Sequence, residues 1–328
     1  MNSRTDMKQG ESRSGERGAA LIIVLGLVAL ISAWAVTAAY EDTLSLRRAE
    51  NNRDAIRSQQ ASQSMLWLSL KLLRDDSKES QNDHLDEIWA QQSDAFPIDD
   101  GSVLGSITDS NRFINLNTLV DKKGKVIVEV EKQVKALFLQ LELDEQLVHA
   151  LIDWMDADDR PSGAGGAEDA SYYDRDYRIK NGRLDRWGEL RLVRGFDDEV
   201  VAALNAVVMV RDVPESDIST VNINTATVPV LMAVMPTMTQ ADAEIFISER
   251  PFDSVQQALE DRDWATAVNQ AYLSVVSDIF MVRTQASFGR VVLREKYLLL
   301  RESGKITLLS SEQAGHEPLP ETSEETRL

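Results

Sequence analysis

The strongest hydrophobic pattern in the sequence is an uncharged run from Ala19 to Tyr40. Its 22 residues would form a helix of roughly 33 Å, which is enough to cross the hydrocarbon core of a bilayer. A buried core helix and a secretory signal peptide are the alternatives. The run is longer than a typical signal core, however, and no small-x-small cleavage site ends it. We therefore predict a membrane-spanning helix.

The polar segment that follows, residues 41–76, contains neither Gly nor Pro and is rich in good helix formers. This pattern predicts one long helix, with its first half in lipid and an amphipathic second half outside the membrane. The apolar face of the outer half is expected to contain Leu44, Ile56, Met65, Leu66, Leu68, Leu70, Leu72 and Leu73.

The rest of the chain has strand patterns on both sides of a helical block. Residues 77–98 are polar and irregular, with Trp89 and Phe96 as expected anchors, and residues 118–274 have a mainly helical pattern. Alternating residues predict strands at 101–116, 278–288, 290–303 and 305–311, with turns at Gly289 and Gly304. The expected fold class is α+β, with a large α-helical domain inserted between the strands of a sheet.

The helical block contains a weak internal repeat, in which the segment 115–118 (NLNT) is echoed at 222–225 (NINT). The second unit resembles a helix-hairpin-helix unit, a type that can bind DNA through a glycine-rich hairpin. Here the hairpin at 235–239 has no Gly, and Asp242 and Glu244 lie nearby. Such a hairpin cannot easily approach phosphate, so we interpret the repeat as a reused packing unit.

Composition argues against several function classes. The 328 residues include 35 Lys+Arg and 54 Asp+Glu, a net charge of −19, so a nucleic-acid partner held by phosphate contacts is not expected. Cys is absent, which excludes disulfides and thiolate sites, and only three His are present. These counts favour a protein that is not an enzyme.

One segment concentrates carboxylates, with six of them in the 17 residues from Asp153 to Asp169 around a Gly-rich stretch. Hard oxygen ligands on a flexible turn suit Ca²⁺, although Arg160 breaks the EF-hand spacing. A solvated acidic loop and a glycosidase-like pair of carboxylates remain alternatives. No cleft with aromatic platforms can be argued around the loop in support of the second.

The amino terminus carries a sharper signal, because a leader with four basic residues ends in Gly18, directly before the apolar helix at Ala19. It resembles the leader of a type IV prepilin, which implies cleavage after Gly18 by prepilin peptidase and methylation of the new amine of Ala19. Mature position five is Ile23, where most such proteins have Glu. Its absence is typical of the minor pseudopilins of type II secretion in the general secretion pathway protein K family. A subunit with no neighbour above it has no partner for this carboxylate, and an unpaired carboxylate is costly in lipid.

The resemblance to the protein K family extends over nearly the whole chain. It rests on the segments 112–120 (RFINLNTLV) and 180–195 (KNGRLDRWGELRLVRG), on the acidic loop with Trp154, and on the Tyr172-Tyr173 pair. It implies a structural Ca²⁺ in the loop. The implied ligands are Asp156, Asp158, Glu168 and Asp169, and the further candidates are Asp153, expected to face the helix interior, and Asp159, expected to cap a turn.

The same resemblance implies a function, and together with the residue patterns it gives a domain plan. The chain would lie in the bacterial inner membrane with its large part in the periplasm, and would join the I-type and J-type minor pseudopilins at the tip of a pseudopilus built from the major pseudopilin. The alternatives are a membrane-anchored periplasmic hydrolase and a DNA-uptake receptor. The expected parts are a leader at 1–18, a transmembrane stretch at 19–40, a pseudopilin α+β domain at 41–114 and 275–311, an inserted helical domain at 115–274 with its acidic loop at 153–176, and a disordered acidic tail at 312–328.

Overall fold

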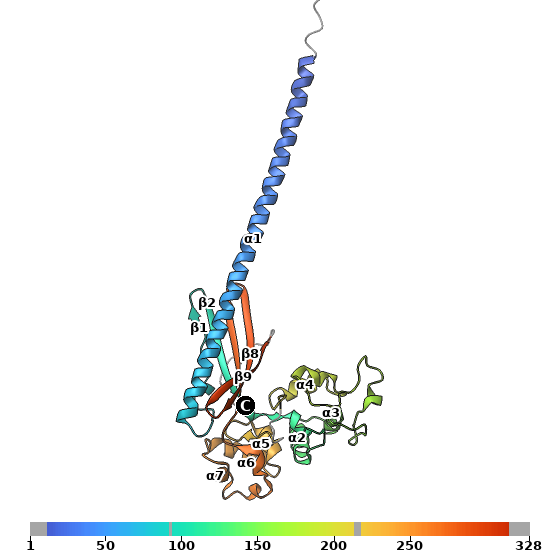
Figure 1. Ribbon diagram of the computed structural model, residues 1–328, viewed down its shortest axis with the longest axis vertical. Coiled ribbons are helices and arrows are strands. Elements are labelled where there is room, and N and C mark those ends of the chain that lie inside the picture. Colours follow the sequence, from blue (N-terminus) through green and yellow to red (C-terminus); the bar gives the residue numbers. More distant parts are fainter. Residues whose placement is uncertain (1–11, 92–93, 213–217, 315–328) are drawn as a thin grey trace, which may run out of the picture.

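The computed structural model describes residues 12–91, 94–212 and 218–314. Its dominant element is a single helix of 68 residues, α1 (Ser12–Glu79), whose upper half stands clear of the rest of the molecule (Figure 1). Within the described residues, this is the one helix that is long and apolar enough to cross a membrane. The predicted long amino-terminal helix is therefore confirmed. Most of the leader and the greater part of the acidic tail lie outside the described residues.

The lower half of α1 packs on a five-stranded antiparallel sheet with the strand order β1-β2-β7-β8-β9. The strands are β1 (Phe96–Ile98), β2 (Gly101–Asp109), β7 (Ile279–Phe288), β8 (Val291–Glu302) and β9 (Lys305–Gln313). Gly289 and Gly304 have φ values of 55° and 76°, which suits the tight turns that join the last three strands. The register aligns Asp109 at the end of β2 with Phe280 of β7.

The face of α1 that meets the sheet combines apolar and small polar residues. Met65 and Leu73 are buried there, and the hydroxyl of buried Ser62 contacts Thr284 and Tyr297. Of the predicted apolar positions, Leu44, Ile56 and Leu68 are exposed instead. The sheet covers only one side of the lower part of the helix, so apolar residues above it or on its far side are left uncovered by the described part of the chain.

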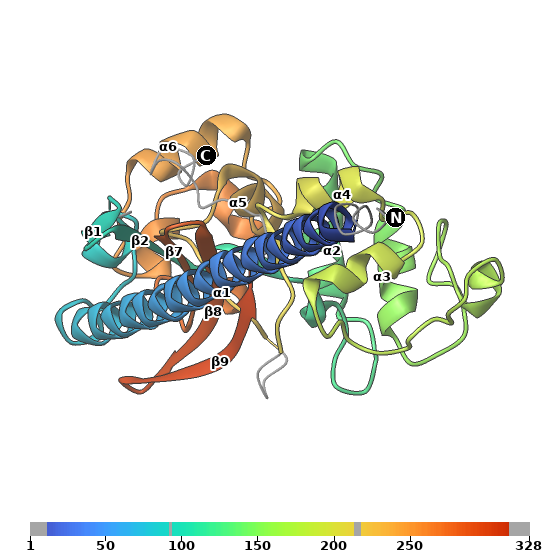
Figure 2. The ribbon, with the colours of Figure 1, turned by 90° about the horizontal axis from the view of Figure 1, so that it is seen from above.

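The helical block lies between β2 and β7 in the chain. In Figure 2, α2, α3 and α4 form one group, and α5 and α6 form another. Its helices are α2 (Val128–Gln140), α3 (Leu147–Met155), α4 (Asp198–Leu204), α5 (Val228–Val234), α6 (Gln240–Ser248) and α7 (Val255–Leu259). One contiguous apolar core, which includes Phe138, Leu151 and Phe246, runs through both groups.

The two Asn-x-Asn-Thr segments adopt the same local structure. Asn115 accepts a hydrogen bond from the backbone of Asn117, and Asn222 accepts one from the backbone of Asn224. The first Asn of each segment is the last residue of a two-residue strand. Each of these strands pairs in parallel with another: β3 (Ile114–Asn115) with β4 (Val208–Met209), and β5 (Val221–Asn222) with β6 (Leu273–Ser274). Each Asn side chain thus satisfies a backbone amide in the turn that follows its strand.

Two local expectations need correction. Trp89 is buried as predicted, but Phe96 is 48% exposed on β1, because this short edge strand lies outside the helix-covered part of the sheet. The predicted strand at 101–116 is interrupted after Asp109 by a short 3₁₀ turn, η2 (Ser110–Arg112), where the chain leaves the sheet for the helical block. At the other end, β9 extends to Gln313, two residues into the expected tail.

Candidate metal centre

The acidic loop starts from the buried end of α3. Asp153 lies in its last turn and is fully buried, and it accepts hydrogen bonds from the backbone amides of Ser162 (2.8 Å) and Ala167 (2.6 Å). The hydroxyl of Ser162 donates to the same carboxylate. Asp153 therefore uses both oxygens to hold the loop against the helix. Its side chain is buried, in line with the inward orientation expected from the sequence.

Glycines allow this close return of the chain. Gly165 has a φ of 89°, and a Cβ there would lie 2.7 Å from the carbonyl oxygen of Gln146. A Cβ on Gly166 would lie 2.6 Å from Oδ2 of Asp153. The flexible stretch that separates the acidic residues in sequence is thus what brings them together in space.

Three of the predicted ligands converge at the mouth of this loop. One carboxylate oxygen from each of Asp156, Asp158 and Glu168 lies within 4.8 Å of the others. Asp156 is 5% exposed and Glu168 is 7% exposed, whereas Asp158 faces solvent. Among the described residues, Oδ1 of Asp156 and both oxygens of Glu168 are buried without a hydrogen-bond partner.

Electrostatics in the cluster is unfavourable without a cation. Burial, with the charges of Asp153 and Asp156, raises the pKa of Glu168 to about 7, and burial with the charges of Asp158 and Asp153 raises the pKa of Asp156 to about 6. Buried, unpartnered oxygens held close together are the donor set of a hard divalent cation. The residues present therefore fit a metal ion.

The other predicted ligands are not members of this converging group. Asp169 has its Oδ2 3.8 Å from Nη1 of Arg178, and Asp159 accepts a weak hydrogen bond from Asn181. Asp153 is the buried organiser of the loop. The group of residues that could hold a metal is thus Asp156, Asp158 and Glu168.

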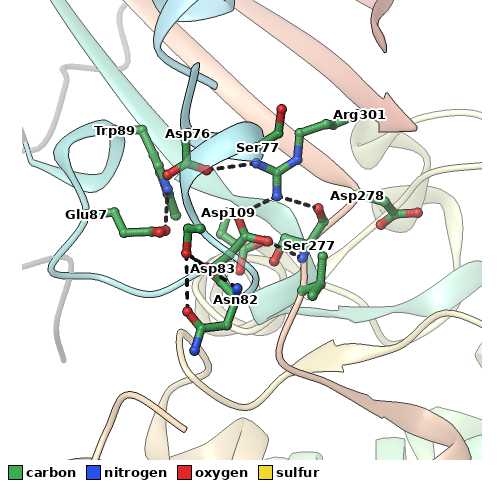
Figure 3. A network of polar contacts seen from close by, with 12 residues as sticks. Asp76, Ser77, Asn82, Asp83, Glu87, Trp89, Asp109, Ser277, Asp278 and Arg301 are labelled. Carbon is green, nitrogen blue, oxygen red and sulfur yellow. Dashed lines mark hydrogen bonds and ion pairs between the residues drawn. The ribbon is translucent and has the colours of Figure 1, made fainter. Parts of the chain in front are cut away.

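A second acidic cluster, which the sequence interpretation missed, lies where α1 meets the helical block (Figure 3). Carboxylate oxygens of Asp76, Asp83 and Glu87 also approach one another within 4.8 Å. Here Arg301 of β8 binds Asp76 at 2.9 Å and forms an ion pair with Asp83. The side chain of Arg301 is only 8% exposed.

Hydrogen bonds complete the second cluster. Glu87 accepts from the indole nitrogen of Trp89 at 2.7 Å, and Asp83 accepts from the backbone amide of Ser277 at 2.7 Å. Asn222 of the helical block donates to the backbone oxygen of Asp83 at 3.0 Å. An arginine and hydrogen-bond donors therefore occupy the space that a metal would need, and the cluster joins α1, the sheet and the helical block (Figure 3).

Comparison with known proteins extends over nearly the full chain. Two family profiles, both described as "Type II secretion system (T2SS), protein K", match residues 112–213 and 221–276. A type II secretion system protein K of Pseudomonas aeruginosa is 30% identical over 94% of this chain and 97% of its own length. The corresponding protein of Pectobacterium carotovorum is 29% identical over 93% of this chain and 98% of its own.

A similar fold is found in a solved structure, the crystal structure of the GspK-GspI-GspJ complex from the type 2 secretion system of enterotoxigenic Escherichia coli. A chain of that structure has a TM-score of 0.69 and 23% sequence identity, with 81% of this chain and 99% of that chain covered. A long amino-terminal helix whose end packs on an antiparallel sheet defines the class of pilin-like proteins.

Within that class, the chain belongs to the type II secretion system protein K family. It is a minor pseudopilin, a structural component of the secretion system and not an enzyme.

Proposed function

We propose that this protein is one subunit of a heteromeric tip complex that initiates and caps the periplasmic pseudopilus, together with I-type and J-type minor pseudopilins. Support comes from the likeness to a chain of the GspK-GspI-GspJ complex. The bulk of the helical block adds a physical argument, because it would obstruct the side-by-side packing of a repeated fibre subunit, whereas an end position leaves room for it.

The far side of α1 supplies a surface for these neighbours. Ile56 and Trp67, three helical turns apart, are 49% and 69% exposed, and the sheet lies on the other side of the helix. Exposed large apolar side chains aligned on a helix suit the helix of an adjacent subunit.

Copurification tests this assignment. We expect the tagged full-length chain, expressed with the I-type and J-type pseudopilins of the same bacterium, to retain both, and Trp67→Asp to lose at least one. Tyr173→Asp changes an aromatic residue of the helical block that is even more exposed, at 87%, and serves as the control. Retention of both partners by Trp67→Asp would contradict the helix surface, and absence of both from the unaltered chain would contradict the tip complex.

We also propose entry into this assembly through the prepilin pathway. Prepilin peptidase would cut between Gly18 and Ala19, which lie exposed on α1, and the remaining chain would stay anchored in the inner membrane by its apolar stretch with the sheet and helical block in the periplasm. The intact mass of the protein from membranes with active peptidase should fit a chain that starts at Ala19 and carries one methyl group. A chain that still starts at Met1 would contradict this pathway.

The metal that the acidic loop takes is, in our proposal, Ca²⁺ in a structural role. Asp156, Asp158 and Glu168 would form its protein core, with backbone oxygens and water free to complete the six to eight oxygens that Ca²⁺ accepts. The unpartnered buried oxygens of Asp156 and Glu168 carry this proposal.

Thermal unfolding tests the calcium proposal. Chelation should lower the melting temperature of the full chain, and Asp158→Ala with Glu168→Ala should abolish that sensitivity. The matched control is Glu199→Ala with Glu260→Ala, which removes two exposed carboxylates of the helical block. An unaltered protein that is insensitive to the chelator would disprove the site.

For the helical block, we propose that the two Asn-x-Asn-Thr units are copies of one helix-hairpin-helix-like packing element with no DNA-binding role. Their shared side-chain contacts and parallel strand pairs support the duplication. A gel-shift experiment at low salt should show no retention of duplex DNA by the purified chain.

A further inference from the structure

A histidine of α3 contacts the acidic loop at a residue outside the candidate metal group. His149 lies four residues before Asp153, so the two side chains lie on the same face of α3, one turn apart. Asp153 accepts hydrogen bonds from backbone amides of the loop, and Nδ1 of His149 lies 2.6 Å from the carbonyl oxygen of Ala164. The Gly-rich stretch that leads to Glu168 is therefore held by two successive turns of one helix.

The loop fits closely against the imidazole ring of His149. A Cβ on Gly163 would lie 2.9 Å from Cε1 of the ring and 3.0 Å from Nε2. The backbone amide of Gly166 donates to the carbonyl oxygen of Gly163 at 3.0 Å, so the residue that touches the ring also forms the turn before Glu168. The side chain of His149 is only 16% exposed, which shields its contact with the loop from water.

Two residues of α2 hold the ring from its other nitrogen. Nζ of Lys135 lies 2.8 Å from Nε2 of His149 and 2.7 Å from Oε1 of Glu131. Oε1 of Glu131 lies 3.9 Å from the same ring nitrogen. The side chains of Glu131 and Lys135 are 23% and 26% exposed, so this pair is less solvated than an ordinary surface pair. Through His149, the acidic loop is connected to α2, which itself packs on α5.

The two neighbours of the ring determine which of its nitrogens carries the proton. A carbonyl oxygen can only accept a hydrogen bond, so Nδ1 must donate to Ala164. An ammonium group can only donate, so Nε2 must accept from Lys135. A neutral imidazole with its proton on Nδ1 satisfies both contacts. With the proton on Nε2 instead, two donors would face each other and the carbonyl oxygen would face a lone pair.

We propose that His149 is a positioning residue of the calcium loop, which donates from Nδ1 to Ala164 and keeps Glu168 close to the other two ligands before the ion binds. This inference rests on the proposed calcium site. Without the contact, repulsion among the three carboxylates favours open loop conformations, and the apparent affinity for calcium falls with the fraction of closed loops. Lys135, held by Glu131, selects the tautomer that makes the contact.

Calorimetric titration of the purified full chain with calcium, in detergent, tests this role. We expect His149→Leu, which is similar in bulk but has no donor, to weaken calcium binding about fivefold or more. His149→Asn places an amide donor near the position of Nδ1 and should bind within about twofold of the unaltered chain. The melting temperature in chelator shows whether each variant is folded.

A substitution in α2 tests the same role without a change in the loop or in α3. Lys135→Met should weaken calcium binding about two- to threefold, since the ring can then adopt either tautomer. The matched control is Lys132→Met on the same helix, because the side chain of Lys132 is 70% exposed and pairs only with Glu129 among the described residues. This control should bind calcium normally.

The tautomer supplies a readout that a packing role would not change. The chain has three His, so nitrogen NMR of a sample labelled at the histidine rings gives few signals, and His149→Asn identifies the signals of His149. In calcium we expect a protonated Nδ1 and an unprotonated Nε2. Lys135→Met should give a mixture of the two tautomers.

Three outcomes would overturn the role of His149. His149→Leu could bind calcium as tightly as the unaltered chain. The loss could instead be confined to His149→Asn, which would mean that the ring acts by its bulk. The proton could lie on Nε2, which would exclude the contact with Ala164. Absence of calcium binding by the unaltered chain would contradict the calcium site itself, and the tautomer would then still decide whether His149 holds the loop.

Discussion

Two groups of three carboxylates lie in the described part of this protein, and they differ in one neighbour. Asp76, Asp83 and Glu87 surround a buried arginine, Arg301, whereas Asp156, Asp158 and Glu168 have no cationic side chain among them. Spacing of the oxygens is similar in both groups. Proximity of carboxylates therefore does not by itself distinguish a metal site from a structural ion pair. The useful observation is whether the buried carboxylate oxygens have hydrogen-bond or ion-pair partners.

The distinction follows from how each group satisfies its buried atoms. At the junction of α1 and the helical block, Arg301, Ser277 and Trp89 supply donors to the three carboxylates. In the acidic loop, Oδ1 of Asp156 and both oxygens of Glu168 are buried and have no donor among the described residues. Since an unpaired buried charge is strongly unfavourable, a cation would stabilise the ionised loop, whereas the junction already contains one in Arg301.

The largest expected effect comes from removal of the internal cation. Arg301→Gln leaves Asp76 and Asp83 buried without their partner, which should lower the free energy of unfolding by about 3–5 kcal/mol. Urea unfolding of the full chain measures this, with Arg290→Gln expected to stay within about 0.5 kcal/mol. A small change in Arg301→Gln would mean that the junction tolerates its carboxylates without the arginine.

The second prediction concerns Glu168 and reverses sign with calcium. In chelator, Glu168→Gln removes a buried, uncompensated charge and should raise the melting temperature. In calcium at about a hundred times its dissociation constant, the same variant should lose up to about 2.7 kcal/mol of ligand stabilisation. An effect of the same sign in both buffers would mean that the loop holds no calcium.

The third prediction is a pH dependence that calcium separates into two parts. Glu168 and Asp76 both have a pKa raised to about 7, the first by burial and neighbouring carboxylates and the second by burial, Glu87 and Asp83 against the opposing charge of Arg301. Unfolded carboxyls titrate near pH 4, so the folded chain holds more protons between about pH 4 and 7. In chelator, stability should therefore fall as the pH rises through this window.

Calcium should remove the contribution of the loop and leave that of the junction. Calcium binds the deprotonated loop, so its affinity should rise over the same pH interval. Asp76→Asn should flatten the remaining slope of stability against pH at saturating calcium. Melting temperatures measured from pH 5 to pH 8 would decide, and a slope unchanged by Asp76→Asn would assign it to other groups.

The smallest expected effect tests which carboxylates lie outside the set of calcium ligands. Asp169→Asn should change the calcium affinity by no more than about twofold, because this exposed carboxylate lies outside the converging group. Asp158→Asn should weaken binding much more. Calorimetric titration of both variants measures the difference, and equal losses would enlarge the ligand set.

The sequence was sufficient for features that depend on neighbours in the chain. The charge-free run predicted α1, and alternation with Gly289 and Gly304 predicted β7, β8 and β9. The dense carboxylates at 153–169 indicated the acidic loop. Which three of them converge depends on the inward turn of Asp153, and that contact is made only when the loop folds back on α3.

Long-range partners escaped the sequence interpretation. Arg301 lies 225 residues from Asp76, so no local pattern marks their ion pair.

The register of β2 and β7 has an evolutionary consequence. Asp109 ends one strand opposite Phe280 near the start of its neighbour, so the helical block leaves and re-enters the sheet at one point. A short hairpin could close that gap and restore a simple helix-and-sheet subunit, because insertions are tolerated where the two chain ends meet. The covalent links between the block and the sheet therefore meet at one place, which makes the block a module. Such a module can diversify without disturbing the sheet that carries it.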